Sequence, residues 1–180
     1  MIRPATLQDI PEILRLIREL ADYENEPEQV QATPVDLQAA LFPADGAPTA
    51  YAHVCDLADR VVGMAVWNLS FSTWTGRNGI WLEDLYVEPA HRGSGWGVGL
   101  LRALAQLCRE RGYPRLEWHC LDWNQPSIDF YEGIGAQQLS QWSTFRMEAS
   151  AMSALCADAA AADTGDVVGR DRSDGGVAVR

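Results

Sequence analysis

The apolar positions of this chain change period twice, and each change predicts a different kind of element. Over residues 10–21, apolar side chains recur every three or four positions, which predicts an amphipathic helix. Between residues 50 and 87 they fall in short blocks separated by turns, which is typical of strands. The helical period returns over 98–112 and stops at Gly112 and Pro114. The pattern therefore mixes helices with a sheet.

The predicted elements follow the order β-α-α-β-β-β-α-β-α-β-β, which indicates a mixed α/β or α+β domain around a central sheet. Two helix starts carry capping signals, Thr6 with Asp9 and Thr33 with Asp36. Helices are predicted at 6–21, 33–42, 98–112 and 126–135. Strands are predicted at 2–5, 50–56, 61–71, 79–87, 115–120, 137–141 and 144–148.

The composition changes near residue 148. Beyond it the chain is rich in Ala, Asp, Gly and Ser and has no aromatic residue. We therefore expect one domain over 1–148 and a disordered tail over 149–180, with a frayed, alanine-rich helical start. A chain of 180 residues is long enough to bury one substantial core.

The charge of the chain excludes several classes of function. A net charge of −11 argues against nucleic acid or an anionic membrane as a partner, because like charges repel. All 14 basic residues are arginine. The absence of lysine excludes Schiff-base chemistry, pyridoxal-phosphate attachment and a Walker-type phosphate loop.

The four cysteines, at positions 55, 108, 120 and 156, are scattered and have no histidine at ligand spacing. They predict free thiols in a reducing cytoplasm and no metal site. The N-terminus lacks a secretory pattern, and no apolar run reaches the roughly 18 residues that a membrane span needs. We expect a cytoplasmic protein.

The segment 79-GIWLEDLYVEPAHRGSGWGVGLL-101 is the most informative part of the chain. Glycines at alternate positions between a strand and a helix let backbone N–H groups approach an anion, and the helix N-terminus favours negative charge. The pattern is typical of a phosphate-binding loop, with a flexible turn as the simpler interpretation. A dinucleotide-binding loop is a further alternative, because Glu117 or Asp122 follows downstream.

Three stretches resemble one family in the order in which that family has them. They are IRPATLQDIPEILRLIRELADYE, STWTGRNGIWLEDLYVEPAHRGSGWG and LDWNQPSIDFYEGIGAQ, between residues 2 and 147. Together they are similar to the N-acetyltransferases of the GNAT family, and most of all to the diamine (spermidine/spermine) and thialysine acetyltransferases. The resemblance implies the GNAT fold, a mixed but mostly antiparallel sheet flanked by helices, in which the two strands that bind the cofactor splay apart.

The resemblance also implies the acetyl donor and the residues that would hold it. The donor is acetyl-CoA, and the loop pattern [Q/R]-x-x-G-x-[G/A] would cradle its pyrophosphate. The loop residues are Arg92, Gly93, Ser94, Gly95, Trp96, Gly97 and Val98. The other donor contacts expected are Leu85, Tyr86, Val87, Asn124 and Ser127.

The remaining implied roles concern the amine and the proton. Glu83 would lead the proton away from the amine, and Tyr131 would protonate the departing thiolate. Tyr23, Glu24, Glu83 and Asp84 would contact the amine. Neighbours in a regular strand face opposite ways, so Glu83 and Asp84 share a pocket only if the bulge that the family has is present here. That bulge would also free N–H groups at Leu85 and Val87 for the thioester oxygen.

Several questions stay open at the level of sequence. Di- or polyamines suit the acidic stretch around Tyr23, whereas thialysine or lysine suits the STWTGR and LDWNQ segments, with Arg77 as a partner for the carboxylate. A non-catalytic acyl-CoA-binding or regulatory module and a dinucleotide-binding oxidoreductase are the alternatives of a different class. The resemblance further implies a homodimer.

Overall fold

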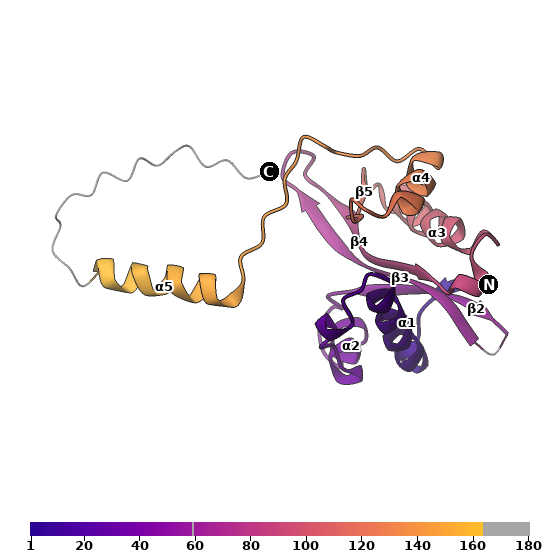
Figure 1. The fold of residues 1–180 in the computed structure, drawn as a ribbon, viewed down its shortest axis with the longest axis horizontal. Coiled ribbons are helices and arrows are strands. Elements are labelled where there is room, and N and C mark those ends of the chain that lie inside the picture. The colour runs from indigo at the N-terminus through magenta and orange to yellow at the C-terminus, as the bar shows by residue number, and fades with distance from the viewer. Residues whose placement is uncertain (59, 164–180) are drawn as a thin grey trace. The chain divides into compact units, whose positions relative to one another are not determined.

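In the computed structural model of the protein, the described residues form one sheet of five strands, whose order in the sheet follows their order in the chain (Figure 1). The strands β1 to β4 pair antiparallel, and β5 joins β4 in parallel. Their bounds are Ile2–Pro4 (β1), Tyr51–Leu57 (β2), Arg60–Ser72 (β3), Arg77–Val87 (β4) and Leu116–Glu117 (β5). The structure describes residues 1–58 and 60–163.

Five α-helices accompany the strands in the described part of the chain. They are α1 (Ile10–Tyr23), α2 (Pro34–Leu41), α3 (Trp96–Arg111), α4 (Gln125–Gly133) and α5 (Ala149–Asp163). Short 3-10 turns occur at Leu7–Asp9, Pro27–Gln29 and Pro89–His91. Among the described residues, no helix has both the length and the apolar character to cross a membrane.

Both predicted capping signals are confirmed. The backbone N–H and the hydroxyl of Thr6 donate to the Asp9 carboxylate at 2.7 and 2.9 Å. Thr33 makes the same two contacts with Asp36 at 2.9 and 2.6 Å. The first of these caps a 3-10 turn, so the regular helix α1 begins at Ile10 and not at residue 6.

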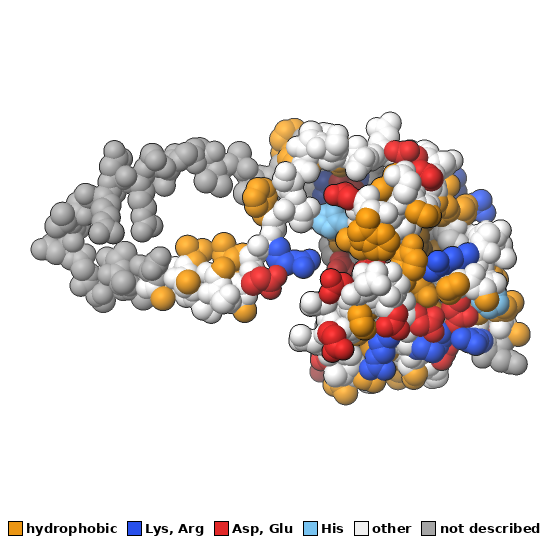
Figure 2. Space-filling view, in the orientation of Figure 1, with side chains coloured by type: hydrophobic (Ala, Val, Ile, Leu, Met, Phe, Trp, Pro, Cys, Tyr) orange, Lys and Arg blue, Asp and Glu red, His pale blue; other side chains and the backbone are white. Residues whose placement is uncertain are grey.

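The sheet lies between two helical layers, which is why β3 is buried continuously from residue 61 to residue 67. On one face, Met64 and Val66 pack beneath α1 and α2. On the other face, Ala65 and Trp67 pack beneath α3. Figure 1 shows α1 and α2 on one side of the sheet and α3 and α4 on the other. Figure 2 shows acidic side chains and arginines intermingled over the face that α1 and α2 form.

β5 is shorter than predicted, and the shortening matters for the site. Only Leu116 and Glu117 pair with β4, opposite Ile80 and Trp81. A strand was predicted over 115–120, but residues 118–120 leave the sheet. The carboxyl-terminal half of β4 therefore has β3 on one side and no strand of the described chain on the other. This is the splayed strand pair that the resemblance implied.

The two predicted strands at 137–141 and 144–148 are wrong, since these residues are irregular. A strand needs a partner whose backbone groups it can pair with, and none is present in the described chain. The chain divides into two units, Met1–Ala136 and the residues from Gln137 onward. The predicted domain limit at residue 148 stays a prediction.

The tail was predicted to be disordered beyond a frayed helical start. Residues 149–163 form α5, so the helical start is longer than expected. Its alanine-rich sequence accounts for this, because alanine has the highest intrinsic helix propensity. The rest of the predicted tail, 164–180, lies outside the described residues.

Candidate active site

A β-bulge interrupts β4 at the two adjacent carboxylates. Asp84 pairs with Val66, and Leu82 pairs with the next residue of β3, Trp67, so Glu83 is an extra residue without a partner in β3. A bulge of this kind bends the strand and changes which way the following side chains point. The bulge that the resemblance implied is therefore present.

The core residues on either side of the bulge determine which way the two acids face. Leu82 packs in the cluster beneath α3, and so do Leu85 and Val87. Leu82 and Leu85 are three positions apart, whereas a regular strand returns to one face every two. Both residues between them therefore face the other side, toward α1. Trp81 is on that side too, because its Nε1 donates to the Glu83 carboxylate at 3.0 Å.

Two neighbouring carboxylates act on Asp84. The pKa of Asp84 is raised to about 6, chiefly by burial and further by the charges of Glu83 and Glu24. Glu24 follows α1 directly, and burial also raises its pKa. Glu83 is exposed. Carboxylates that repel one another in a poorly solvated site are stabilised by a bound cation.

The position of α1 against β4 is fixed by an ion cluster around Glu88, the residue that follows β4. Glu88 is 6% exposed, and its carboxylate accepts from Arg15 of α1 and from Arg60 of β3, each at 2.7 Å. Arg15 also donates to the Val61 carbonyl at 2.8 Å. The end of α1 that carries Tyr23 is thereby held beside the acids of β4.

The carboxyl end of α1 contacts the loop before α4. The Tyr23 hydroxyl donates to Asn124 Oδ1 at 3.0 Å, and the Tyr23 ring lies 6.0 Å from the Trp123 ring. Asn124 is 7% exposed and caps α4, since its Oδ1 also accepts from the Ser127 N–H at 3.4 Å. The predicted amine contact Tyr23 and the predicted donor contact Asn124 are thus direct partners.

Helix α4 carries Tyr131 on the side of the sheet that α3 covers. The Tyr131 ring lies 4.9 Å from Trp118 and 5.2 Å from Phe130. Its pKa is raised to about 12, first by burial and then by the charges of Cys120 and Glu24. The phenol is therefore protonated at neutral pH, as a proton donor must be. The influence of Glu24 also shows that Tyr131 lies within electrostatic range of the carboxylates.

The glycine loop between β4 and α3 has the backbone of an anion site. Gly93 and Gly95 have φ of 74° and 83°, a left-handed conformation that side-chain-bearing residues rarely adopt. The first hydrogen bond of α3 runs from the Gly99 N–H to the Gly95 carbonyl. The N–H groups of the preceding helical residues, Trp96 to Val98, therefore have no acceptor within the helix and are available to an anion.

The other two glycines of the pattern have a different role, because α3 begins at Trp96 and not at the predicted residue 98. Gly97 and Gly99 are helical. A Cβ at Gly97 would lie 3.5 Å from Phe130, and a Cβ at Gly99 would collide with the Cδ1 of Ile2. Gly99 therefore lets α3 approach β1 closely, whereas a side chain at Gly97 would only touch Phe130.

The free edge of β4 offers further donors toward the splayed gap. The Glu88 N–H donates to Val62 of β3 at 3.0 Å. Because N–H directions alternate along a strand, those of Val87 and Leu85 point away from β3, into the gap that β5 leaves. Arg92 reaches the same edge, where its Nε donates to the Val87 carbonyl at 2.9 Å. The guanidinium of Arg92 lies over two rings, 4.9 Å from Tyr23 and 5.4 Å from Tyr86.

The structure thus brings the predicted residues of α1, β4, the glycine loop and α4 together. It does not bring Arg77 to them. Arg77 begins β4, seven residues before Asp84, and a strand rises roughly 3.3 Å per residue. Its Nη1 lies near Gly112, at the end of α3. Sequence reasoning did not place Cys120 near the site. Cys120 raises the pKa of Tyr131, and burial together with the charge of Glu24 raises the pKa of Cys120. An isolated cysteine gave no signal.

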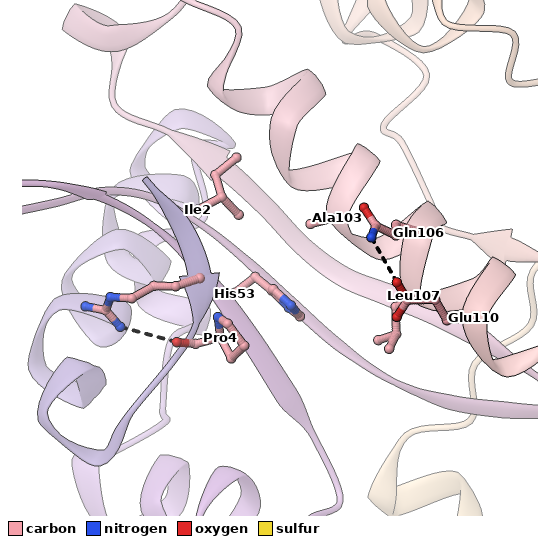
Figure 3. Close-up of a pocket in the computed structure, with 8 residues that line it drawn as sticks. Ile2, Pro4, His53, Ala103, Gln106, Leu107 and Glu110 are labelled. Carbon is pink, nitrogen blue, oxygen red and sulfur yellow. Dashed lines mark hydrogen bonds between the residues drawn. The ribbon is translucent and has the colours of Figure 1, made fainter.

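Two open hollows of about 230 Å³ each lie elsewhere, and the predicted site residues do not line them. Both are bordered by Pro4, His53 and Leu107. Figure 3 shows one of them, between the edge of the sheet at β1 and the later turns of α3. His53 Nδ1 accepts from Trp67 Nε1 at 3.2 Å, and burial lowers the pKa of His53. We therefore interpret His53 as a neutral packing residue.

Comparisons with known proteins agree with this geometry. The model of the acetyltransferase (GNAT) family matches residues 13–136. A thialysine N-epsilon-acetyltransferase of Bos taurus is 39% identical over 166 residues, covering 86% of this chain and 96% of the relative. The human spermidine/spermine N(1)-acetyltransferase-like protein 1 is 35% identical over 155 residues, which cover 81% of this chain but 22% of that longer protein.

Solved structures with the same fold include an integron cassette protein from the mobile metagenome of V. cholerae. It superimposes with a TM-score of 0.72 at 22% identity, covering 87% of this chain and 96% of that one. At this identity the likeness establishes the arrangement of the sheet and helices, and nothing about the substrate.

Proposed function

Because this chain belongs to the acetyltransferase (GNAT) family and is an N-acetyltransferase that uses acetyl-CoA, we propose that its acceptor is a small aliphatic amine with two ammonium groups. Diamines, polyamines, lysine and thialysine share this chemistry. The observation that carries the proposal is the cluster of Glu83 and Asp84 in β4 with Glu24 at the end of α1, in which the pKa values of Glu24 and Asp84 are raised. A dication would offset the charges of Glu83 and Glu24 that act on Asp84.

The acids would also prepare the amine for attack. An alkylamine has a pKa of about 10.4, so it arrives protonated and must lose a proton before its nitrogen is a nucleophile. We assign the role of accepting this proton to Glu83 and Asp84. The pKa of Asp84 is raised to about 6, chiefly by burial and also by the charge of Glu83, so Asp84 is suited to accept a proton near neutral pH. Glu83 is exposed and can pass the proton on to solvent.

The neutral nitrogen would then attack the thioester carbonyl. The N–H groups of Leu85 and Val87, which point into the splayed gap, would stabilise the negative oxygen of the tetrahedral intermediate. The N–C bond forms, and the nitrogen would release its second proton to solvent. The C–S bond then breaks, the thiolate would take a proton from Tyr131, and the amide and the CoA thiol leave while Tyr131 regains a proton from solvent. Tyr86, Asn124, Ser127 and the loop from Arg92 to Val98 would hold the rest of the donor.

Tyr131 would supply the proton for the thiolate. A phenol with a pKa of about 12 is a weaker acid than a thiol near 8.5, so the donation is uphill by roughly 5 kcal/mol. The high pKa of Tyr131 comes chiefly from burial, then from the charge of Cys120, and last from the charge of Glu24. An ammonium bound at Glu24 would offset the last of these and lower the pKa of Tyr131 in part.

The experiment compares amines that differ only in the second ammonium group. CoA release is measured with cadaverine against pentylamine, and with lysine against Nα-acetyl-lysine. We expect kcat/KM to be about 10- to 100-fold higher for the dication of each pair, because one charge-assisted hydrogen bond contributes a factor of about this size. Equal values within each pair would refute the second ammonium site, and no release with any amine would refute the acceptor class.

Spermidine, putrescine and thialysine in the same assay separate the substrate types. Selectivity for thialysine and lysine would require a cation for the carboxylate, and Arg77 is remote from the acids. Among the described residues, Arg92 is the candidate for this cation, because its guanidinium lies against Tyr23, the neighbour of Glu24. Selectivity for di- and polyamines requires no such cation.

We also propose that the protein is a cytoplasmic homodimer. All four cysteines are free thiols, which suits a reducing compartment. Large apolar side chains in the irregular segment after residue 136 are exposed, Phe145 by 92% and Leu139 by 52%. Such side chains suit burial against a second copy. Light scattering should give a mass near twice 19.8 kDa, and a mass of 19.8 kDa at micromolar concentration would refute the dimer.

A further inference from the structure

The side-chain amide of Asn124 is oriented by two donors on the same oxygen. The Tyr23 hydroxyl lies 3.0 Å from Asn124 Oδ1, and the Ser127 N–H lies 3.4 Å from it. The reversed amide would place an NH2 group against the Ser127 N–H, donor against donor. Two protein groups therefore fix Oδ1 as the inward end, and the Nδ2 end is directed elsewhere with two N–H donors to offer.

Tyr23 has a second partner in the glycine loop. The Arg92 guanidinium lies 4.9 Å from the centre of the Tyr23 ring, and Arg92 Nε donates to the Val87 carbonyl at 2.9 Å. A cation over an aromatic face is attracted to it, and the planar guanidinium suits this contact better than an ammonium. The first residue of the phosphate loop is thus held between the end of β4 and the end of α1.

Asn124 and Arg92, which both contact Tyr23, belong to the side of the site assigned to the acetyl donor. The Tyr23 hydroxyl donates its one hydrogen to Asn124, so this hydrogen is directed to the donor side of the site and not to the acids. The acids assigned to the amine are Glu24, Glu83 and Asp84, and Tyr23 has no hydrogen bond to them in the described chain. Its contacts differ from the role in amine binding that the resemblance implied.

We infer that Tyr23 is a positioning residue for the acetyl donor, whose hydroxyl orients the Asn124 amide and whose ring holds Arg92 at the mouth of the glycine loop. Asn124 Nδ2 then presents its N–H groups to a carbonyl of the donor. The inference rests on the proposed function, because it needs the donor to lie against Asn124 and the loop. It makes α1, the helix before the amine-binding acids, part of the donor site.

The variant Tyr23→Phe tests the hydroxyl alone, because the ring that faces Arg92 remains. We expect KM for acetyl-CoA and the calorimetric Kd for CoA to rise about 3- to 10-fold, as for the loss of one neutral hydrogen bond, with KM for the amine changed less than 2-fold. The matched control is Tyr51→Phe, whose ring stacks on Trp67 at 4.5 Å away from this site and whose constants should stay unchanged. A rise in the amine KM with an unchanged Kd for CoA would overturn the inference.

The variant Asn124→Ala separates this inference from the proposed function. If Asn124→Ala leaves the Kd for CoA unchanged, the donor does not use Asn124 and the proposed donor site fails. If Asn124→Ala weakens CoA and Tyr23→Phe does not, the inference alone fails. In the double variant, we expect no further weakening beyond Asn124→Ala, since the hydroxyl acts through the amide. Fully additive effects would overturn that coupling.

Discussion

Replacing Asp84 by asparagine should make the folded protein more stable at neutral pH while it removes the proton acceptor. The pKa of Asp84 is raised from 3.8 to about 6, chiefly because the carboxylate is buried. A shift of roughly two pKa units, at 1.36 kcal/mol each, means that the ionised side chain costs the fold about 3 kcal/mol. Asparagine keeps the shape and carries no charge, so most of this cost disappears.

The effect has a definite pH dependence. Since Asp84 holds its proton more tightly in the folded than in the unfolded chain, the wild-type protein loses stability as pH rises from about 4 to about 6, and the loss is complete above that range. Asparagine does not titrate. The stability advantage of Asp84→Asn should therefore be about 1 kcal/mol at pH 4.5 and about 3 kcal/mol at pH 8.

Urea unfolding at the two pH values measures this difference, with CoA release as the activity readout. The matched control is Asp45→Asn, which changes an exposed loop acid and should alter neither quantity. An advantage of Asp84→Asn that is equal at pH 4.5 and pH 8, or a variant that is less stable at pH 8, would refute the reasoning. Retained activity would refute the role of Asp84 as proton acceptor.

Three further outcomes are expected. Tyr131→Phe should lower kcat by about 10²- to 10⁴-fold with little change in either KM, measured by steady-state CoA release; an unchanged kcat contradicts the acid role. Gly95→Ala must adopt a φ of 83°, so it should lose about 1–2 kcal/mol in urea unfolding and bind CoA more weakly by calorimetry; unaltered binding contradicts the loop assignment. Gly99→Ala should lower the thermal midpoint, and Ile2→Val should restore part of it by removing the colliding Cδ1; a loss that Ile2→Val does not relieve contradicts the collision.

The parts of the fold that local sequence determines could be predicted. The Thr6–Asp9 and Thr33–Asp36 caps depend on groups three residues apart, and both form. The order of elements up to residue 133 also follows from local periodicity. The strands expected at 137–148 could not be verified locally, since a strand exists only where a partner accepts its hydrogen bonds.

For the site, the residues could be predicted, but their tertiary contacts could not. The positions of Glu83, Asp84 and Tyr131 followed from the resemblance, and the phase change between Leu82 and Leu85 is visible in the sequence once a bulge is considered. The contacts of Arg92 with Tyr23 were not predictable, because they join side chains that are 69 positions apart and depend on how α1 packs. The greater burial of Asp84 over its neighbour likewise depends on tertiary packing.

A single residue distinguishes β4 from a regular strand paired with β3. Ile80 and Leu82 alternate at a spacing of two, and so do Leu85 and Val87; Glu83 is the single residue that puts the pairs out of step. Deleting one codon, that for Glu83, would bring all four into one unbroken alternation with β3. Substitutions test what a side chain does, but this deletion would keep the core side chains on one face while it removes both the bulge and the second carboxylate. In this strand, one inserted residue is what allows two neighbouring acids to face the same side of the sheet.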